Sequence, residues 1–215
     1  MEKKRNFTLD VLRDDAMIEL VFPEGATKEE REINWQKIAE ISDADLGFND
    51  PRDDDTARVR FCVRILLVND KREVCVIKSE KHGYLQIPGG GIEQNESIEE
   101  ALSRETEEET GYLIKNIAPL GYLIENRQDK RNEYSWGKVI SFVFAAIVAG
   151  LGQLNYTEGE ALEEFHPYWI NLDELISIYK QNEGKKEGYT GTFANRRDLI
   201  VAKYYNRDKF LKTSV

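Results

Sequence analysis

The stretch Pro88–Tyr112, PGGGIEQNESIEEALSRETEEETGY, carries the most specific information in the chain. The glycines at 89–91 give the backbone a conformational freedom that other residues lack. Ser97 and Glu100 have the spacing of a capping box, which marks the first turn of a helix, and Gly111 stands where a helix-ending glycine is expected. The sequence therefore predicts a glycine-rich loop followed by a helix between Ser97 and Gly111.

Some glutamates of this helix lie on the face that packing would bury. An apolar stripe begins with Ile98 and Leu102, and each residue advances the helix by about 100°. Glu105, Glu108 and Glu109 continue that stripe. A helix built only for packing would have leucine or isoleucine at these positions.

An acidic helix is more often simply solvated, and this alternative explains the glutamates that point away from the stripe, Glu99, Glu100 and Glu107. It does not explain the glutamates on the buried side, because like charges at this spacing repel by about 0.2–0.5 kcal/mol per pair, and more when desolvated. A hard cation relieves that repulsion, and carboxylates are the ligands that magnesium, calcium and manganese prefer. We therefore expect a divalent metal site on this face.

Positions Gly90 to Tyr112 closely resemble the Nudix box of the Nudix hydrolase (MutT-like) family. The family pattern is GX5EX7REUXEEXGU, with U a bulky aliphatic residue, and its fixed positions are all present at the right spacing: Gly90, Glu96, Arg104, Glu105, Glu108, Glu109 and Gly111. The departures are Thr106 and Tyr112 at the two U positions, which affect packing but no ligand. The resemblance implies an α/β fold, an α/β/α sandwich with a mixed β-sheet.

The same resemblance implies a metal centre. Carried over position by position, it makes the ligands of Mg²⁺, with Mn²⁺ as a substitute, the following groups: the carboxylates of Glu105, Glu108 and Glu109 and the carbonyl of Gly89. Arg104 is expected to lie off the ligand face, in an ion pair with Glu96 that fixes the loop against the helix. Its part in catalysis would be indirect.

Residues outside this helix complete the expected site. In the family the general base is either a box glutamate or a carboxylate from a later loop, and the spacing to Trp169 favours Glu163 or Glu164. The alternative is that these two are solvated loop charges. Substrate binding is assigned to Lys78, where relatives often carry a phosphate-binding basic residue, and to Gly90.

Composition excludes several other classes. The net charge of −10 and a pI near 4.9 argue against a nucleic-acid binder, which presents a basic surface, but not against a phosphorylated small molecule. The longest apolar run, Val139–Ala149, is too short to span a bilayer, so no membrane partner is expected. Cys62 and Cys75 show no metal spacing and no signal peptide is evident, so we expect reduced thiols in a cytoplasmic protein.

We expect two parts in the chain: an N-terminal extension over residues 1–57, partly helical and of unknown role, and a Nudix hydrolase domain over residues 58–215. Within the extension, Thr27 and Glu30 form a second capping box, which predicts a helix that carries Trp35 and Ile41 and ends at Gly47. We expect the extension to pack on the main domain or on a second subunit, as in a homodimer.

From Ala57 onward the pattern alternates between strands and helices. Strands are expected at 59–68, 73–78, 113–125 with an interruption at Pro119, 139–149 and 165–170. Further helices are expected at 171–179 and from 192 or 193 to about 205. Such interleaving predicts a mixed sheet covered on both faces, which is compatible with the sandwich that the resemblance implies.

The resemblance implies Mg²⁺-dependent hydrolysis of a nucleoside diphosphate linked to another moiety, such as a nucleoside triphosphate, a nucleotide sugar or a dinucleotide. Two alternatives use the same fold. A sensor that binds a nucleotide without turnover usually loses box glutamates, and all of them are kept here. A prenyl diphosphate isomerase would need a histidine-based metal site, and the chain has only two histidines.

Overall fold

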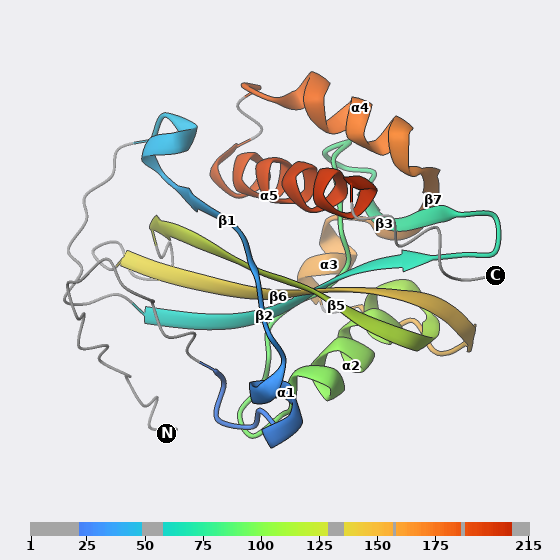
Figure 1. Ribbon diagram of the computed structural model, residues 1–215. Helices are drawn as coiled ribbons and strands as arrows, with labels where there is room; N and C mark the ends of the chain where they lie inside the picture. Colours follow the sequence, from blue (N-terminus) through green and yellow to red (C-terminus); the bar gives the residue numbers. More distant parts are fainter. Residues whose placement is uncertain (1–21, 49–57, 129–135, 157, 186–187, 208–215) are drawn as a thin grey trace.

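One mixed β-sheet organises the part of the chain that the computed structural model describes, residues 22–48, 58–128, 136–156, 158–185 and 188–207 (Figure 1). Across the sheet the strands follow the order β1 (Lys37–Ser42), β5 (Tyr112–Gln128), β6 (Trp136–Leu151), β2 (Arg58–Val68), β3 (Glu73–Ser79) and β4 (Leu85–Gln86). A further strand, β7 (Phe165–Asn171), pairs antiparallel with β3. The pairs β1–β5 and β2–β6 are parallel, whereas β5–β6 and β3–β4 are antiparallel.

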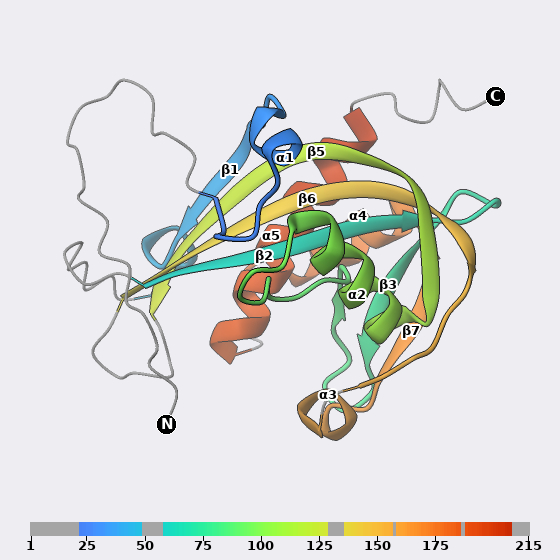
Figure 2. The ribbon, with the colours of Figure 1, turned by 90° about the horizontal axis from the view of Figure 1, so that it is seen from below.

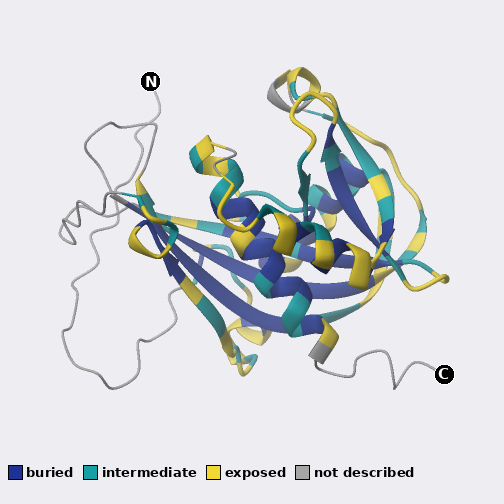
Figure 3. Ribbon diagram, turned by 90° about the horizontal axis from the view of Figure 1, so that it is seen from above, coloured by how far each residue is buried: buried dark blue, intermediate teal, exposed yellow. Residues whose placement is uncertain are grey.

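Strand β2 shows why both faces of this sheet need a cover. Successive side chains of a strand point to opposite faces. Val63, Ile65 and Leu67 accordingly pack with one hydrophobic cluster, and Leu66 and Val68 pack with another. The expected covering of both faces is therefore confirmed. In Figure 3 the middle of the sheet is buried, whereas exposed residues lie on the loops and on parts of the helices.

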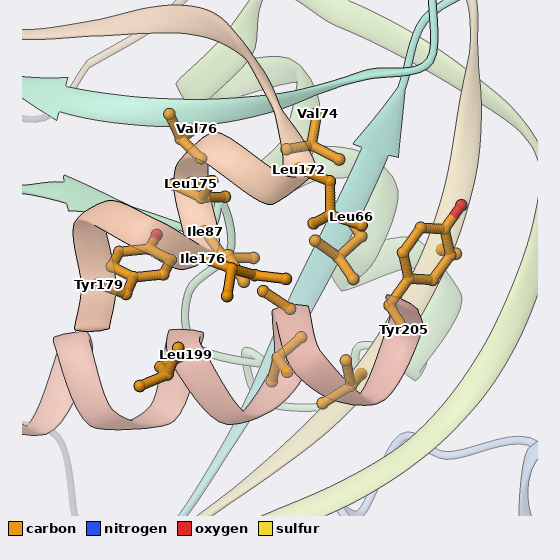
Figure 4. Close-up of a cluster of buried hydrophobic side chains, with 14 of the residues drawn as sticks. Leu66, Val74, Val76, Ile87, Leu172, Leu175, Ile176, Tyr179, Leu199 and Tyr205 are labelled. Atoms are coloured by element: carbon orange, nitrogen blue, oxygen red, sulfur yellow. The ribbon is translucent and has the colours of Figure 1, made fainter. Parts of the chain in front are cut away.

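Helices α4 (Leu172–Asn182) and α5 (Gly188–Arg207) cover one face (Figure 1). Asn171 caps α4 by accepting a hydrogen bond from the backbone N–H of Asp173. Leu175 and Tyr179 of α4 meet Leu199 of α5 and Leu66 of the sheet in a close-packed cluster (Figure 4). This layer therefore rests on apolar packing between the two helices and the sheet.

Helix α2 (Ile98–Thr110) covers the opposite face (Figure 2). Its residues Ile98 and Leu102 are fully buried against the sheet. The short helix α1 (Lys28–Glu32) lies beside the beginning of α2 in Figures 1 and 2. Two smaller elements are the 3-10 turn η1 (Ala44–Leu46) and the helix α3 (Glu158–Leu162).

The prediction of a helix from Thr27 towards Gly47 is wrong beyond the first turn. The capping box of Thr27 and Glu30 is present, but Ile33 is extended and ends the helix after five residues. The following residues form β1, which pairs parallel with β5. An isolated helix of this length is marginal, so pairing with a long strand outweighs local helix propensity. Gly47 does end a helical segment, but the segment is η1.

The other predicted elements are present with changed ends. Strand β5 is continuous through Pro119, because register shifts on either side of this residue accommodate it. Helix α5 begins at Gly188, a few residues earlier than expected. The first 21 residues of the extension, residues 49–57 and residues 129–135 lie outside the described residues. The homodimer and the division at residue 57 stay predictions.

Among the described helices, none has the length and apolar character needed to cross a membrane.

Candidate active site

Helix α2 begins and ends as the sequence predicted. Ser97 Oγ accepts the N–H of Glu100, and the carboxylate of Glu100 accepts the N–H of Ser97. Gly111 closes the helix in the left-handed conformation. At the first U position, Thr106 is buried and donates its hydroxyl to the carbonyl of Leu102 at 2.6 Å. This departure from the Nudix pattern is therefore satisfied within the helix.

The glycine loop runs along the edge of β2. Backbone N–H groups of Val63 and Ile65 donate to the carbonyls of Gly90 and Pro88, both at 3.0 Å. Gly89 has φ +132°, and a Cβ there would lie 2.2 Å from the carbonyl oxygen of Val63. Only glycine fits this close approach. Through these two hydrogen bonds the loop pairs with β2 as a short additional strand would.

The three predicted carboxylate ligands approach this loop from α2. Glu109 is buried and its Oε2 accepts the N–H of Gly89 at 2.7 Å. Glu105 packs against bare backbone, because a Cβ on Gly90 would lie 2.3 Å from its Oε2. Glu108 lies closer to solvent and contacts Arg104. The structure thus brings the glycine loop and α2 into contact, as expected.

Arg104 connects the parts of this site. Its guanidinium donates to both oxygens of Glu96, at 2.7 and 2.9 Å, and to the carbonyl of Gly91 at 3.0 Å. The predicted ion pair with Glu96 is therefore confirmed. The hydrogen bonds between Arg104 and Glu96 lower the pKa of the Glu96 carboxyl and raise the pKa of the Arg104 guanidinium.

The expectation that Arg104 lies off the ligand face is wrong. Its Nη1 is 2.9 Å from Oε1 of Glu105 and 3.1 Å from Oε2 of Glu108. The backbone position of Arg104 is about 100° from that of Glu105, but its long side chain turns back along the helix. Burial raises the pKa of Glu105, and the positive charges of Arg104 and Arg64 only partly oppose this rise.

A second arginine, Arg64 on β2, escaped the sequence analysis. It is partly buried and donates to the carbonyl of Gly89, the predicted main-chain ligand. Burial and the nearby charge of Arg197 lower the pKa of Arg64. The available signal was an arginine inside an apolar strand, at a position that alternation places on the face opposite to Val63 and Ile65.

Two further charged residues near the glycine loop, Arg197 and Asp198, come from α5. Asp198 is buried, accepts the N–H of Ile87 at 2.8 Å and pairs with Arg197 at 2.7 Å. Asp198 and Glu125 raise the pKa of Arg197 against the opposing effect of burial. The charged groups behind the glycine loop thus hold both ends of it, Ile87 through Asp198 and Gly89 through Arg64.

The candidates from outside the box have other partners. Glu163 contacts Lys81 at 3.8 Å and His82 at 3.1 Å, and Lys78 pairs with Glu80 at 2.8 Å. The backbone of Glu164 adopts φ +54° just before β7. In the described residues these contacts join Glu163 and Lys78 to the β3–β4 side of the sheet rather than to the glutamates of α2, so their assigned roles stay predictions.

The donors around the glycine loop fit a hard divalent cation in kind. They are oxygen atoms of carboxylates and one carbonyl, and a cationic group, the guanidinium of Arg104, already bridges Glu105 and Glu108. Across the described chain, however, no three aspartate, glutamate, histidine or cysteine side chains stand close enough together to hold one ion. The chemistry of the site therefore suits magnesium, whereas its side chains are arranged around Arg104.

The family model for the NUDIX domain matches residues 58–190, which include the glycine loop, α2 and β7. Among solved structures, the chain is similar to a NUDIX hydrolase from Nitrosomonas europaea, with 18% identity over 69% of this chain and 89% of that one and a TM-score of 0.48. It is also similar to the MutT protein from Bacillus halodurans, with 25% identity, 55% and 72% coverage and a TM-score of 0.44. The MutT protein from Methanosarcina mazei shows 20% identity, 70% and 97% coverage and a TM-score of 0.43.

Proposed function

The chain belongs to the NUDIX hydrolase family, and on this basis we propose that it hydrolyses a pyrophosphate bond in a nucleoside diphosphate linked to another moiety, with Mg²⁺ as its cofactor. The observation that carries the proposal is the contact of Glu105 and Glu109 with the Gly89–Gly90 backbone, together with Arg104, which bridges Glu105 and Glu108. The substrate class includes nucleoside triphosphates, nucleotide sugars and dinucleotides.

In the proposed reaction the oxygen of a water molecule forms a bond to one phosphorus atom of the pyrophosphate. The bond from that phosphorus to the bridging oxygen breaks, and two phosphorylated products leave. A proton of the attacking water passes to a carboxylate. When bound, Mg²⁺ neutralises the phosphate oxygens and lowers the pKa of water, which makes it a better nucleophile.

The residues of this chain have distinct parts in the proposal. Glu105, Glu108, Glu109 and the carbonyl of Gly89 would hold the ion. Arg104 would orient Glu105 and Glu108, which it contacts at 2.9 and 3.1 Å. The general base would be a carboxylate of α2 or one of the later candidates Glu163 and Glu164.

We also propose that the substrate is a small nucleotide derivative and not a nucleic acid. The net charge of −10 disfavours a polyanion, whereas a metal ion can offset the few charges of a nucleotide. Binding of substrate phosphates by Lys78 and Gly90 and a cytoplasmic location belong to this proposal.

The test is release of phosphate or pyrophosphate in the presence of Mg²⁺ across a panel of nucleoside triphosphates, nucleotide sugars, NADH, dinucleoside polyphosphates and coenzyme A. We expect turnover of at least one class. Glu108→Gln should lower kcat by about 100-fold or more, because the substitution removes a predicted metal ligand and changes only one partly exposed side chain. Glu99→Gln, on the exposed side of the same helix, serves as the control and should retain activity.

Circular dichroism should show that both variants remain folded. Tight nucleotide binding without turnover of any substrate would contradict the proposal and favour a nucleotide sensor.

A further inference from the structure

The segment Phe22–Trp35 lies before the matched family domain, yet it contacts the beginning of the candidate catalytic helix. We call these residues the brace segment. It contains the short helix α1, and α1 lies beside the start of α2 in Figures 1 and 2.

Glu30 makes the most direct contact between the brace segment and α2. Its Oε1 accepts the N–H of Glu99 at 2.8 Å, and its Oε2 accepts the N–H of Thr27 at 2.7 Å. The N–H of Glu99 lies in the first turn of α2, where backbone donors have no acceptor within the helix. A carboxylate at this end also interacts favourably with the helix dipole. Glu30 itself is buried, so this pairing is shielded from solvent.

A second contact reaches the turn that precedes α2. A Cβ on Gly25 would lie 2.3 Å from the carbonyl oxygen of Glu96, so the two backbones touch. The carboxylate of Glu96 holds Arg104, which in turn contacts Glu105 and Glu108. The brace segment therefore touches both the turn that holds Arg104 and the helix that carries it.

The brace segment is itself fixed to the sheet. Trp35 donates its Nε1–H to the carbonyl of Glu30 at 2.8 Å, and its ring packs 4.9 Å from Phe142 and 5.4 Å from Phe144, measured between ring centroids. Phe22 stacks on Phe142 as well, at 5.8 Å. Since Phe142 and Phe144 belong to β6, the segment connects the centre of the sheet to the N-terminus of α2.

We propose that the brace segment sets the position of α2 relative to the glycine loop, with Glu30 as a positioning residue for the carboxylates that would bind the metal. This inference rests on the proposed function, because it concerns the same carboxylates. It extends the functional unit of the hydrolase to residues that precede the matched domain.

The test compares Glu30→Ala and Glu30→Gln with Glu29→Ala in the full chain. Glu29 is exposed in the same helical turn, so its variant removes the same charge without removing a contact to α2. The first readout is amide hydrogen exchange in α2. We expect exchange at Glu99 to rise at least tenfold in Glu30→Ala and to rise less in Glu30→Gln, which keeps one acceptor oxygen, while Glu29→Ala matches the wild type.

The second readout is the affinity for Mn²⁺, measured by electron paramagnetic resonance without substrate. We expect several-fold weaker binding in Glu30→Ala, partial recovery in Glu30→Gln and no change in Glu29→Ala. With an active wild type, the Mg²⁺ concentration for half-maximal rate should rise by the same factor while the KM for substrate at saturating Mg²⁺ changes less than twofold.

Faster exchange with unchanged Mn²⁺ affinity would overturn the inference, because Glu30 would then be structural only. Unchanged exchange would overturn it as well. If Glu30→Ala does not fold, Glu30→Gln decides both readouts. A wild type that hydrolyses none of the substrate panel would refute the proposed function, whereas exchange and Mn²⁺ binding would still decide the role of the brace segment.

Discussion

At the residue scale, the contact between Gly90 and Glu105 leaves no room for a side chain. A Cβ on Gly90 would lie 2.3–2.5 Å from the atoms of the Glu105 carboxylate. That carboxylate ends a flexible side chain, so it would move aside at little cost in folding free energy. A shift of about 1 Å in a catalytic group can nevertheless cost about 100-fold in rate.

Gly90→Ala should therefore lower kcat/KM by about 100-fold and change the free energy of unfolding by less than about 1 kcal/mol. Steady-state kinetics and urea unfolding measure the two effects. Gly150→Ala is the control, because a Cβ there meets no atom within 4 Å. Equal activity of the two variants would show that Glu105 is not held by its contact with the loop.

The two cysteines are free thiols in the core of the sheet, as expected for reduced residues. Burial raises the pKa of Cys75 to about 12, so its reactive thiolate is scarce at ordinary pH. We expect neither thiol to react with Ellman's reagent at pH 8 in the native protein and both to react in 6 M guanidinium chloride. Rapid labelling of the native protein would mean that β2 or β3 opens readily.

At the scale of the element, the turn before α2 is held by one ion pair. Arg104 lowers the pKa of Glu96 through two hydrogen bonds of 2.7 and 2.9 Å. Because the folded-state pKa lies below the unfolded value, the stabilisation is complete above the unfolded pKa, near 4.5, and is lost as the pH falls through the lower folded pKa.

Glu96→Gln should therefore reduce the free energy of unfolding by about 1 kcal/mol at pH 7, and the difference from the wild type should shrink below about pH 4.5. Urea unfolding from pH 7 to pH 3 measures this effect. Glu93→Gln removes a carboxylate from the same loop and should follow the wild-type curve at every pH. A constant difference between Glu96→Gln and the wild type would exclude a charge effect.

At the scale of the whole molecule, the fold is held by two hydrophobic clusters, one on each face of the sheet. Helix α2 contributes Ile98, Ala101 and Leu102 to one of them. The carboxylates at its other end have protein partners of their own, including Arg104 and the N–H of Gly89. The architecture thus has no need of a bound ion to close its core.

Chelation with EDTA should accordingly abolish hydrolysis and leave the circular dichroism spectrum unchanged. Adding Mg²⁺ back should restore the rate and raise the Tm by a few degrees, because an ion that binds only the folded state stabilises it. Thermal unfolding with and without EDTA makes the measurement. Loss of secondary structure on chelation would identify the metal site as structural.

Much of the fold and part of the candidate site could be predicted from the chain alone, and the reason is their local character. Capping boxes and the glutamate face of α2 depend on residues three or four positions apart, and the end of the helix is marked by a single glycine. Ser97, Glu100 and Gly111 therefore identify the helix directly. The alternation of apolar residues in β2 likewise indicates a sheet with two covered faces.

The tertiary structure alone decided the features that join distant segments. Residues 37–42 became a strand because β5 accepts them as a parallel partner, against the helical pattern of their own segment. Asp198 holds Ile87 over 111 positions, and Glu30 reaches Glu99 over 69. Such contacts depend on how the whole chain closes, and no pattern of neighbouring residues encodes them. The sequence by itself thus determined the candidate catalytic helix and its family, whereas the folded chain decided what holds that helix and its glycine loop in place.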